Sequence, residues 1–196
     1  DPLSPAYPFF LPNGAFIYNK LLEFVRELYE KYDYEEVITP QLFSTDLWKM
    51  SGHYDFYLDN MYMMEIDDKE VGVKPMNCPA HAIIYKSTLR SYRDLPLRLA
   101  DFGRLHRYER SGVTHGLTRV RSFSQDDAHI FCDQKDAANE VKKFLEMLKE
   151  SYSAFGFDKP RMTLSLRPEK RAGSDEMWDL AEEQLRIVIK EFDSNF

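Results

Sequence analysis

The chain is organised around residues 119–132, which read RVRSFSQDDAHIFC. At the two-residue period of a strand, one face of this stretch carries two cations, an aromatic ring, an amide, a carboxylate and an imidazole. These side chains belong to Arg119, Arg121, Phe123, Gln125, Asp127 and His129. We interpret this face as the wall of a pocket for an anionic ligand that carries a ring. The alternative, a polar strand facing solvent, more often shows Lys, Glu and Thr than this mixture.

The residues just before this stretch predict a partner strand. Residues 97–109 read as a strand, and Arg107 and Glu109 fall on the same face of it. Residues 110–118 contain two glycines and no apolar run, which is typical of a mobile loop. Strand, loop and strand predict an antiparallel hairpin that brings Arg107 and Glu109 to the polar face of residues 119–129.

This hairpin offers groups that suit a nucleotide. Arg107 and Arg119 can clamp a phosphate or a carboxylate, because a guanidinium presents a planar fork of donors. Phe123 between them can stack on a flat base, worth roughly 1–3 kcal/mol, and Glu109 can accept from an exocyclic amine. The chain has no GxxxxGK[ST] pattern, so we expect a nucleotide triphosphate site without a glycine-rich phosphate loop.

The remaining elements predict an α+β fold, with helices against an antiparallel sheet. Helices are predicted over residues 14–32 and 44–50, from Pro79 to about Leu89, from Val141 to near Gly156, and after the cap Gly173-Ser174-Asp175. Strands are predicted from Glu35 to Pro40, in a hairpin of residues 61–66 and 70–74, and over Arg161–Leu166. The inward residues of the last helix are predicted to be Met177, Leu180, Ala181, Leu185, Val188 and Ile189.

A cysteine and a histidine suggest a metal site. Cys78 lies at a predicted helix start, where backbone N–H groups favour a thiolate. A cysteine in that position is more often structural than a ligand, but with His129 it makes a possible zinc pair of soft thiolate and imidazole. A third ligand is needed, and the spacing does not select among His81, His106 and His115.

Composition limits the class of protein. The 196 residues, 43% of them hydrophobic, fit one domain with a sizeable core. The formal net charge of −7 gives no overall basic field, so a nucleic-acid role would need a local patch or parts outside this chain. Two cysteines make no disulfide framework and suit a reducing compartment. Without a signal peptide or a membrane-spanning run, we expect a soluble protein of the cytoplasm, with an organellar matrix as the alternative.

Several blocks of sequence carry a specific resemblance to a known family. The strongest are residues 74–79 (KPMNCP), 95–103 (LPLRLADFG), 106–109 (HRYE) and the stretch 119–132. Further blocks at 51–53 (SGH), 167–170 (RPEK) and 173–178 (GSDEMW) extend the likeness over nearly the whole chain. In this order, the blocks closely resemble the catalytic core of the threonyl-tRNA synthetases, which are class II aminoacyl-tRNA synthetases. The resemblance implies the antiparallel sheet flanked by helices of that class, incomplete at the C-terminus.

The resemblance implies a nucleotide-binding role for the hairpin. Arg107 would hold the α-phosphate and the amino acid carboxylate, Glu109 the adenine amine, and Phe123 the adenine face. Arg119 would hold the distal phosphates, and Gln125 would join the ATP-binding and catalytic groups. Mg²⁺ would accompany ATP and offset the phosphate charge.

The resemblance also implies a threonine site that contains zinc. Its threonine-binding residues would be Met76, Cys78, Arg107, Asp127 and His129. Of these, Cys78 and His129 would bind Zn²⁺ together with a histidine that lies outside this chain, and Asp127 would accept from the threonine hydroxyl. His53 matches a catalytic histidine implicated in passing threonine to the terminal ribose of tRNA.

The likeness has departures and gaps. The family has glycine where Ala80 stands and usually asparagine where Tyr108 stands. Motif 3, the editing domain and the anticodon-binding domain have no counterpart in these residues. We therefore expect residues 1–196 to form one class II catalytic domain with motifs 1 and 2, dimeric through the helix 14–32 and the strand to Pro40. Whether this piece alone is active stays open.

The function implied is that of a threonine–tRNA ligase core. It would form threonyl-adenylate from threonine and ATP and then transfer threonine to tRNA(Thr). The rival is a non-catalytic, synthetase-like binding or regulatory module, which need not keep the set Arg107, Glu109, Phe123, Asp127 and Cys78. A seryl or prolyl synthetase is a further alternative, and the cysteine–histidine zinc pair argues against it.

Overall fold

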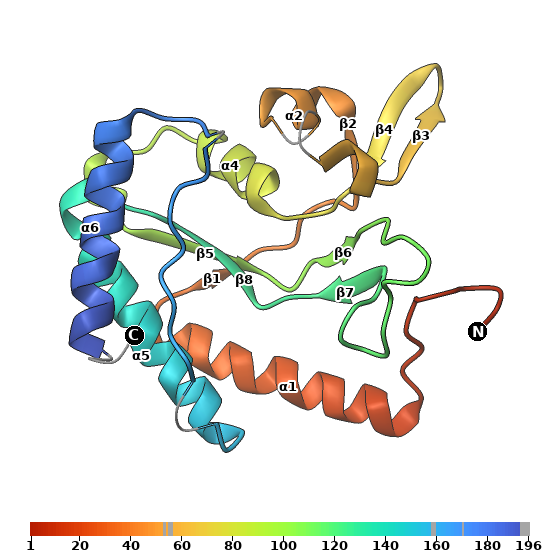
Figure 1. The fold of residues 1–196 in the computed structure, drawn as a ribbon, viewed down its shortest axis with the longest axis horizontal. Coiled ribbons are helices and arrows are strands. Elements are labelled where there is room, and N and C mark those ends of the chain that lie inside the picture. Colours follow the sequence, from red (N-terminus) through yellow and green to blue (C-terminus); the bar gives the residue numbers. More distant parts are fainter. Residues whose placement is uncertain (53, 55–56, 158–159, 170, 193–196) are drawn as a thin grey trace.

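A computed structural model describes residues 1–52, 54, 57–157, 160–169 and 171–192. A small central sheet lies between two groups of helices (Figure 1). Helices α1 and α5 cover one face of the sheet, and α4 covers the other. The described chain is therefore an α+β arrangement of helices around antiparallel pairings, as the sequence predicts.

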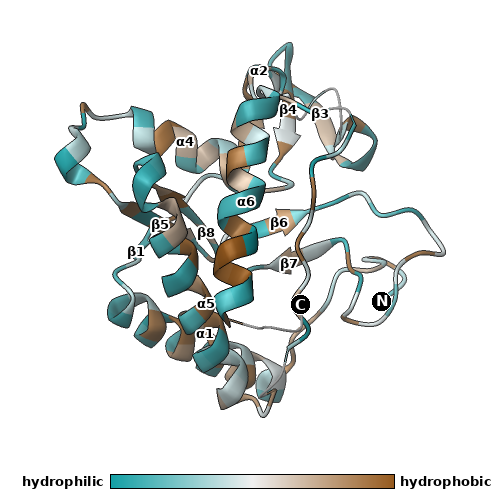
Figure 2. Cartoon of the chain, turned by 60° about the vertical axis from the view of Figure 1, so that its left-hand side comes forward, coloured by the Kyte–Doolittle hydropathy of each residue, from teal (hydrophilic) through white to brown (hydrophobic). Residues whose placement is uncertain are grey.

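The helices follow the predicted apolar spacing, with polar and apolar residues alternating around each of the long ones (Figure 2). Their bounds are α1 (Pro12–Lys31), α2 (Thr45–Met50), α4 (Cys78–Lys86), α5 (Ala137–Ala154) and α6 (Asp175–Phe192). Three short 3₁₀ turns are η1 (Leu58–Asn60), η2 (Tyr92–Asp94) and η3 (Gln134–Asp136). No described helix is both long and apolar enough to cross a bilayer.

The strands form three small sheets. The first contains β1 (Glu35–Glu36), β5 (Leu97–Asp101) and β8 (Asp127–Phe131), the second β2 (Leu42–Ser44), β4 (Lys69–Val73) and β3 (Met63–Ile66), and the third β6 (Arg104–His106) and β7 (Ser122–Ser124). All pairings are antiparallel except that of β1 with β5, which is parallel. The predicted antiparallel pairing is therefore confirmed for the described strands apart from this one parallel edge.

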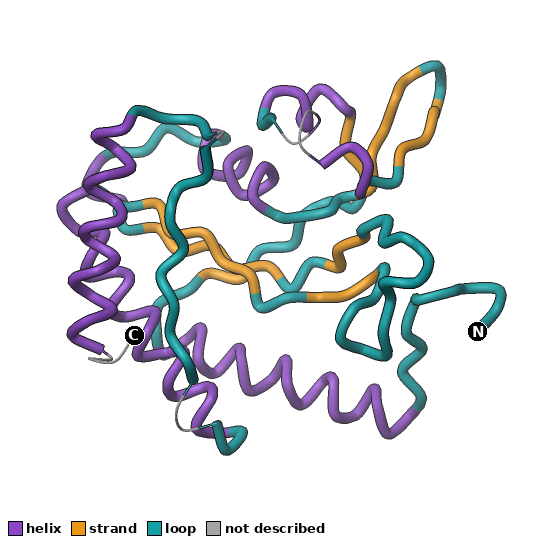
Figure 3. The backbone as a smooth tube through the Cα atoms, viewed as in Figure 1, coloured by secondary structure: helices purple, strands orange, loops and turns teal. Residues whose placement is uncertain are grey.

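The predicted central hairpin is present, but both of its strands are interrupted at the same level. Strand β5 pairs with β8 and β6 pairs with β7, so residues 97–106 run against residues 122–131 in one register. Two residues are unpaired on each side, Phe102-Gly103 and Gln125-Asp126. Because the interruption has equal length on both sides, the alternation of faces is kept across it. Figure 3 shows the two strand segments and the long loop that joins them.

Three predicted strands are shorter than expected or absent. The strand to Pro40 contains only Glu35 and Glu36, which pair with Leu99 and Ala100 of β5. Arg107 and Glu109 lie just beyond β6 rather than within a strand. Residues 161–166 alternate in burial but belong to no strand of the described chain, since no neighbouring strand pairs with them.

The last helix buries a narrower face than predicted. Val188 and Ile189 are buried, but Met177 and Leu180 are 67% and 40% exposed. Helix α6 packs on α5, so residues at the start of α6 have less protein to cover them.

The core lies between the sheet and helices α1 and α5. Leu28 and Tyr29 of α1 pack against Ala100 of β5 and Met147 of α5, and all four are buried. Apolar burial of this kind stabilises by roughly 25 cal/mol for each Å² removed from water. The face of the central sheet toward α1 and α5 carries this packing, and Asp127 and His129 reach α4 on the opposite face.

A buried ion pair joins this core to α5. Arg98 of β5 donates two hydrogen bonds to Glu140 of α5, at 2.6 and 2.9 Å, and both residues are buried. Burial alone would raise the pKa of Glu140, but the hydrogen bonds and charge of Arg98 outweigh it and hold this pKa below the usual range. The pair therefore favours folding only while Glu140 is ionised.

We predict that Glu140→Gln lowers the free energy of unfolding at pH 7 by about 3 kcal/mol, because it leaves a buried guanidinium without its countercharge. The matched control is Glu191→Gln, which breaks the exposed pair with Lys142 and should cost less than about 1 kcal/mol. Since the pKa of Glu140 is lowered by folding, its contribution is present above about pH 4.3 and is lost as the pH falls below that value. Urea unfolding at pH 7 and pH 4 measures both effects, and equal losses for the two variants would contradict the account.

Candidate active site

Two side chains from the start of α4 meet two side chains of β8. Asn77, the residue before α4, donates from Nδ2 to Oδ2 of Asp127 at 2.9 Å. In α4, Nδ1 of His81 lies 2.7 Å from Nδ1 of His129. Residues four apart on a helix and two apart on a strand are both separated by about 6–7 Å along the element. The two pairs can therefore form side by side, and we call them the α4–β8 cluster.

Burial keeps the cluster in place. Asn77 and His81 are fully buried, while Asp127 and His129 are partly exposed. Burial and the neighbouring His129 lower the pKa of His81, so this imidazole is neutral near pH 7. An asparagine before a helix usually caps it, but the side chain of Asn77 makes no cap and turns to Asp127 instead. From the sequence, Asn77 was given no role and His81 was named only as one of three candidate metal ligands, although the spacing of these two residues was a usable signal.

A buried lysine anchors the segment that leads into α4. Lys74 is fully buried, and its Nζ donates to Oγ1 of Thr39 at 2.7 Å and to Oδ2 of Asp101 at 3.4 Å. Thr39 in turn donates to the same Asp101 oxygen at 2.7 Å. The carbonyl oxygen of Lys74 accepts from the backbone N–H of His106 at 3.0 Å. This group ties three distant segments together directly behind the α4–β8 cluster.

The predicted nucleotide groups gather at the end of the hairpin. The guanidinium of Arg107 lies 5.1 Å from the ring centre of Phe123, and its Nε donates to the carbonyl oxygen of Pro75 at 3.2 Å. Nε of Arg119 donates to Oε2 of Glu109 at 3.0 Å. The prediction that Arg107 and Glu109 meet the face of residues 119–129 is confirmed. Glu109 is engaged by Arg119, so a ligand amine would have to share or replace that contact.

Three further predicted residues are placed less firmly. Gln125 is exposed in the interruption between β7 and β8, and Met76 is half-buried next to Asn77. His53 lies outside the described residues. The structure thus brings Arg107 to Phe123 and Arg119 to Glu109. The roles of Gln125, Met76 and His53 stay predictions.

Cys78 is exposed at the first residue of α4. Loss of water around its thiol and the nearby carboxylate of Asp127 raise the pKa of Cys78, although a backbone N–H and Arg107 act in the opposite direction. The backbone N–H at the helix start therefore favours the thiolate, as expected, but burial and the charge of Asp127 outweigh it. The same charges show that Cys78, Asp127 and Arg107 converge on one place.

The donor atoms fit part of a zinc site. Thiolate sulfur and imidazole nitrogen are the usual zinc ligands, and Cys78 and His129 lie beside the same carboxylate and helix start. No group of three or more His, Cys, Asp or Glu residues suitable for a metal occurs among the described residues. Of the three candidates, His81 contacts His129 and His106 contacts Ser122. The backbone of His115 pairs with Arg119 in the loop before β7.

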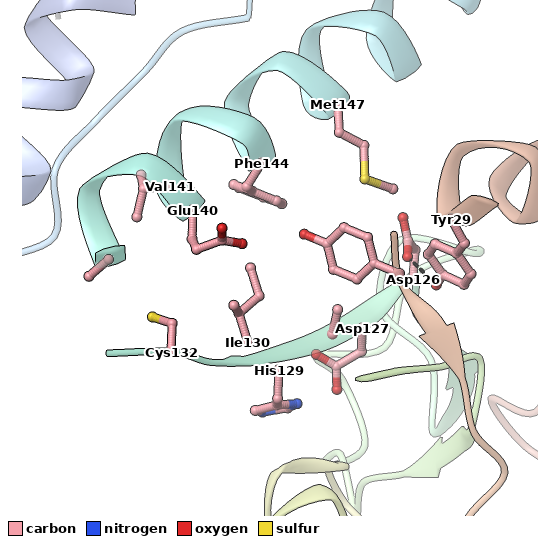
Figure 4. A pocket seen from close by; sticks show the side chains of 13 residues that line it. Tyr29, Asp126, Asp127, His129, Ile130, Cys132, Glu140, Val141, Phe144 and Met147 are labelled. Carbon is pink, nitrogen blue, oxygen red and sulfur yellow. Dashed lines mark hydrogen bonds between the residues drawn. The ribbon is translucent and has the colours of Figure 1, made fainter. Parts of the chain in front are cut away.

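A cavity of about 580 Å³ lies on the opposite face of β8 (Figure 4). Phe144 and Met147 of α5 face Ile130 of β8 across it, whereas His129 points away from it. Asp126 turns toward this side and accepts from the hydroxyl of Tyr29. Neighbouring carboxylates at 126 and 127 therefore bind partners on opposite faces, and β8 forms the wall between the cavity and the α4–β8 cluster.

Comparison with known proteins identifies the relatives of this architecture. Residues 62–189 match the model of the tRNA synthetase class II core domain (G, H, P, S and T). A threonine–tRNA ligase of Bdellovibrio bacteriovorus is 49% identical over 194 residues, which is 99% of this chain and 30% of that protein. The cytoplasmic threonine–tRNA ligase 1 of Homo sapiens is 51% identical over 190 residues, 97% of this chain and 26% of that protein. The chain thus spans less than a third of these relatives.

Solved structures agree with this result. The RNA binding domain of the threonyl-tRNA synthetase from Cryptosporidium parvum Iowa II superposes with a TM-score of 0.88 at 47% identity, over 97% of this chain and 47% of that chain. The prolyl-tRNA synthetase of Giardia lamblia, in complex with prolyl-adenylate, superposes with a TM-score of 0.69 at 22% identity, over 76% of this chain and 31% of that chain. The second likeness concerns the fold alone.

We predict that Gly103→Ala lowers the free energy of unfolding by about 1–3 kcal/mol, the usual cost of overpacking. A Cβ at this position would lie 2.5 Å from Nζ of Lys74 and 2.8 Å from Oδ1 of Asn77. Lys74 cannot withdraw without losing Thr39 and Asp101. Gly14→Ala in α1 is the control: its Cβ meets nothing closer than 3.6 Å, so it should stabilise by about 0.5–1 kcal/mol. Thermal unfolding compares the two, and a neutral Gly103→Ala would show that the buried group is loosely packed.

Proposed function

Because the chain belongs to the tRNA synthetase class II core domain family, we propose that it is the catalytic core of a threonine–tRNA ligase. The reaction joins threonine to the α-phosphate of ATP, releases pyrophosphate, and then transfers threonine to tRNA. One observation carries the proposal: Asp127 contacts Asn77 and Arg107 contacts Pro75, so both reach the start of α4 beside Cys78, where an amino acid and an α-phosphate must meet. Relatives that bear this activity are about half identical over almost the whole chain.

The hairpin end is the proposed ATP site. Arg107 reaches from the side of Phe123 toward the start of α4, so its fork of donors can hold the α-phosphate and the threonine carboxylate together. Phe123 offers a ring face for adenine, Glu109 an acceptor for its amine, and Arg119 a cation for the distal phosphates. Mg²⁺ bound with ATP offsets the remaining charge. The protein then acts by positioning the reactants and stabilising charge, not through a nucleophile of its own.

The α4–β8 cluster is the proposed threonine site. Asp127, held by Asn77 at 2.9 Å, accepts from the threonine hydroxyl. Cys78 and His129 would hold zinc, with a third ligand from a part of the protein outside this chain. When bound, zinc supplies a Lewis acid for the amine and hydroxyl of threonine. A site that binds the hydroxyl of threonine discriminates strongly against valine, which has no hydroxyl. It discriminates poorly against serine, which has one.

The N-terminal helix supports a dimer. Phe16, Ile17 and Leu21 of α1 are 64%, 59% and 42% exposed, and Ile38 beyond β1 is 90% exposed. Such a row of large apolar side chains is costly in water and typical of an interface. We propose a homodimer through α1 and the β1 segment, acting in the cytoplasm, the compartment that the name of the human relative gives.

The rival function is a non-catalytic binding module on the same fold. Such a module would bind ATP or tRNA. It would not need both a phosphate-binding side chain such as Arg107 and a threonine-binding side chain such as Asp127. The described geometry keeps both sets around Cys78, which favours the enzyme. Threonine-dependent exchange of pyrophosphate into ATP separates the two functions, because only the enzyme forms an adenylate.

We predict that Arg107→Ala reduces threonine-dependent ATP–pyrophosphate exchange by at least about 100-fold, since one preorganised donor to developing charge is worth about 2.7–4 kcal/mol. Arg186→Ala, which removes an exposed arginine of α6, is the control and should keep the wild-type rate. The assay uses both this chain and the longer protein that contains it. If the longer protein shows no exchange with any amino acid, the proposed function is wrong.

A second prediction concerns the amino acid. Asp127→Asn should reduce kcat/KM for threonine by roughly 10- to 100-fold, the value of a hydrogen bond to a charged acceptor, while the KM for ATP stays unchanged. Asp126→Asn is a matched control, because the neighbouring carboxylate serves the other face of β8. Wild-type protein should also activate serine but not valine. Equal activation of valine and threonine would contradict the proposed hydroxyl recognition.

A further inference from the structure

The His81–His129 contact cannot be a shared metal site. With Zn–N bonds of about 2.0–2.1 Å at tetrahedral angles, two nitrogens on one zinc ion lie about 3.3 Å apart. The two Nδ1 atoms are only 2.7 Å apart, which is a hydrogen-bond distance. One proton therefore lies between the two rings, and one nitrogen donates while the other accepts.

This hydrogen bond leaves His129 a single nitrogen for a metal. Its Nδ1 is engaged with His81, so only Nε2 is available, and a nitrogen that binds metal cannot carry a proton. The proton of a neutral His129 must then sit on Nδ1 and point to His81. Consequently Nδ1 of His81 is the acceptor, and the proton of His81 is on its own Nε2.

The surroundings of His81 suit this arrangement. Its Nε2 is buried without a hydrogen-bond partner among the described residues. The backbone N–H of His81 donates to the carbonyl oxygen of Asn77 at 3.1 Å, and His129 sits opposite Leu99 in the central sheet. Both rings thus project from backbone that is fixed independently of the contact.

We propose that His81 is the positioning residue of His129: it accepts the Nδ1 proton of His129 and so presents Nε2 of His129, unprotonated, to a metal. The inference rests on the proposed zinc site and assigns the nitrogen that binds. Partners of this kind fix the tautomer and orientation of a metal-binding imidazole, and losing them typically weakens metal binding by about 10- to 100-fold.

The test uses nitrogen NMR of the whole chain with ¹⁵N-labelled histidine, first without metal. In the wild type, we expect His129 to show a protonated Nδ1 and an unprotonated Nε2. His81→Leu removes the acceptor and should give a mixture of both tautomers of His129. His81→Asn places a carbonyl oxygen close to the former Nδ1 and should restore the wild-type tautomer. A role for His81 in packing alone predicts the opposite order, because leucine fills the buried space better than asparagine.

Addition of Zn²⁺ then identifies the ligand atom. We expect the Nε2 resonance of His129 to move, and the affinity for zinc to fall about 10- to 100-fold in His81→Leu while His81→Asn stays near wild type. A proton on Nε2 of His129 in the metal-free wild type, or a tautomer unchanged in His81→Leu, would overturn the inference. A wild type with the expected tautomer but no response to zinc, in this chain and in the longer protein that supplies the third ligand, would instead overturn the zinc site of the proposed function and leave the role of His81 in setting the tautomer intact.

Discussion

The structure depends on one buried charge, the ammonium of Lys74. An ammonium without solvent costs several kcal/mol unless it is paired and hydrogen-bonded, and this one is satisfied only where residues 39, 74 and 101 meet. That requirement fixes the end of β4 against β5 and hence the direction in which the chain enters α4. The side chains of Asn77 and His81 reach β8 because the backbone before them is held in this way. Stability and site geometry therefore share one constraint.

The central sheet separates two kinds of chemistry. On the side of α1 and α5, apolar side chains pack around Leu28 and Met147, and the charge of Arg98 is neutralised by Glu140. On the side of α4, the polar Asp127 and His129 share the face with Leu99. Two side chains there, Asn77 and His81, keep a buried polar atom without a described partner. Such atoms are costly to leave unpaired, so they suit a site that a ligand or ordered water completes.

The sequence predicted those parts of the fold that depend on local chemistry. Alternation along residues 119–132 and the glycine-containing loop before them were enough to predict the hairpin and the meeting of Glu109 with Arg119. The turn at Asp67-Asp68, where both residues have positive φ, was predictable because aspartate tolerates that conformation. Contacts between distant segments were not predictable. Nothing local to Lys74 shows that Thr39 and Asp101 will meet it, and nothing in the alternation of residues 161–166 shows that they find no neighbouring strand.

The central claim is that one face of the structure holds an amino acid and a nucleotide together. The most direct test is calorimetric binding of a non-hydrolysable threonyl-adenylate analogue, compared with the valyl analogue, to the wild type and to the Arg107→Ala and Asp127→Asn variants. The account predicts one site per chain, at least about 10-fold preference for the threonyl analogue, and weakened binding in both variants. Equal affinity for the two analogues, or binding that neither substitution changes, would contradict it.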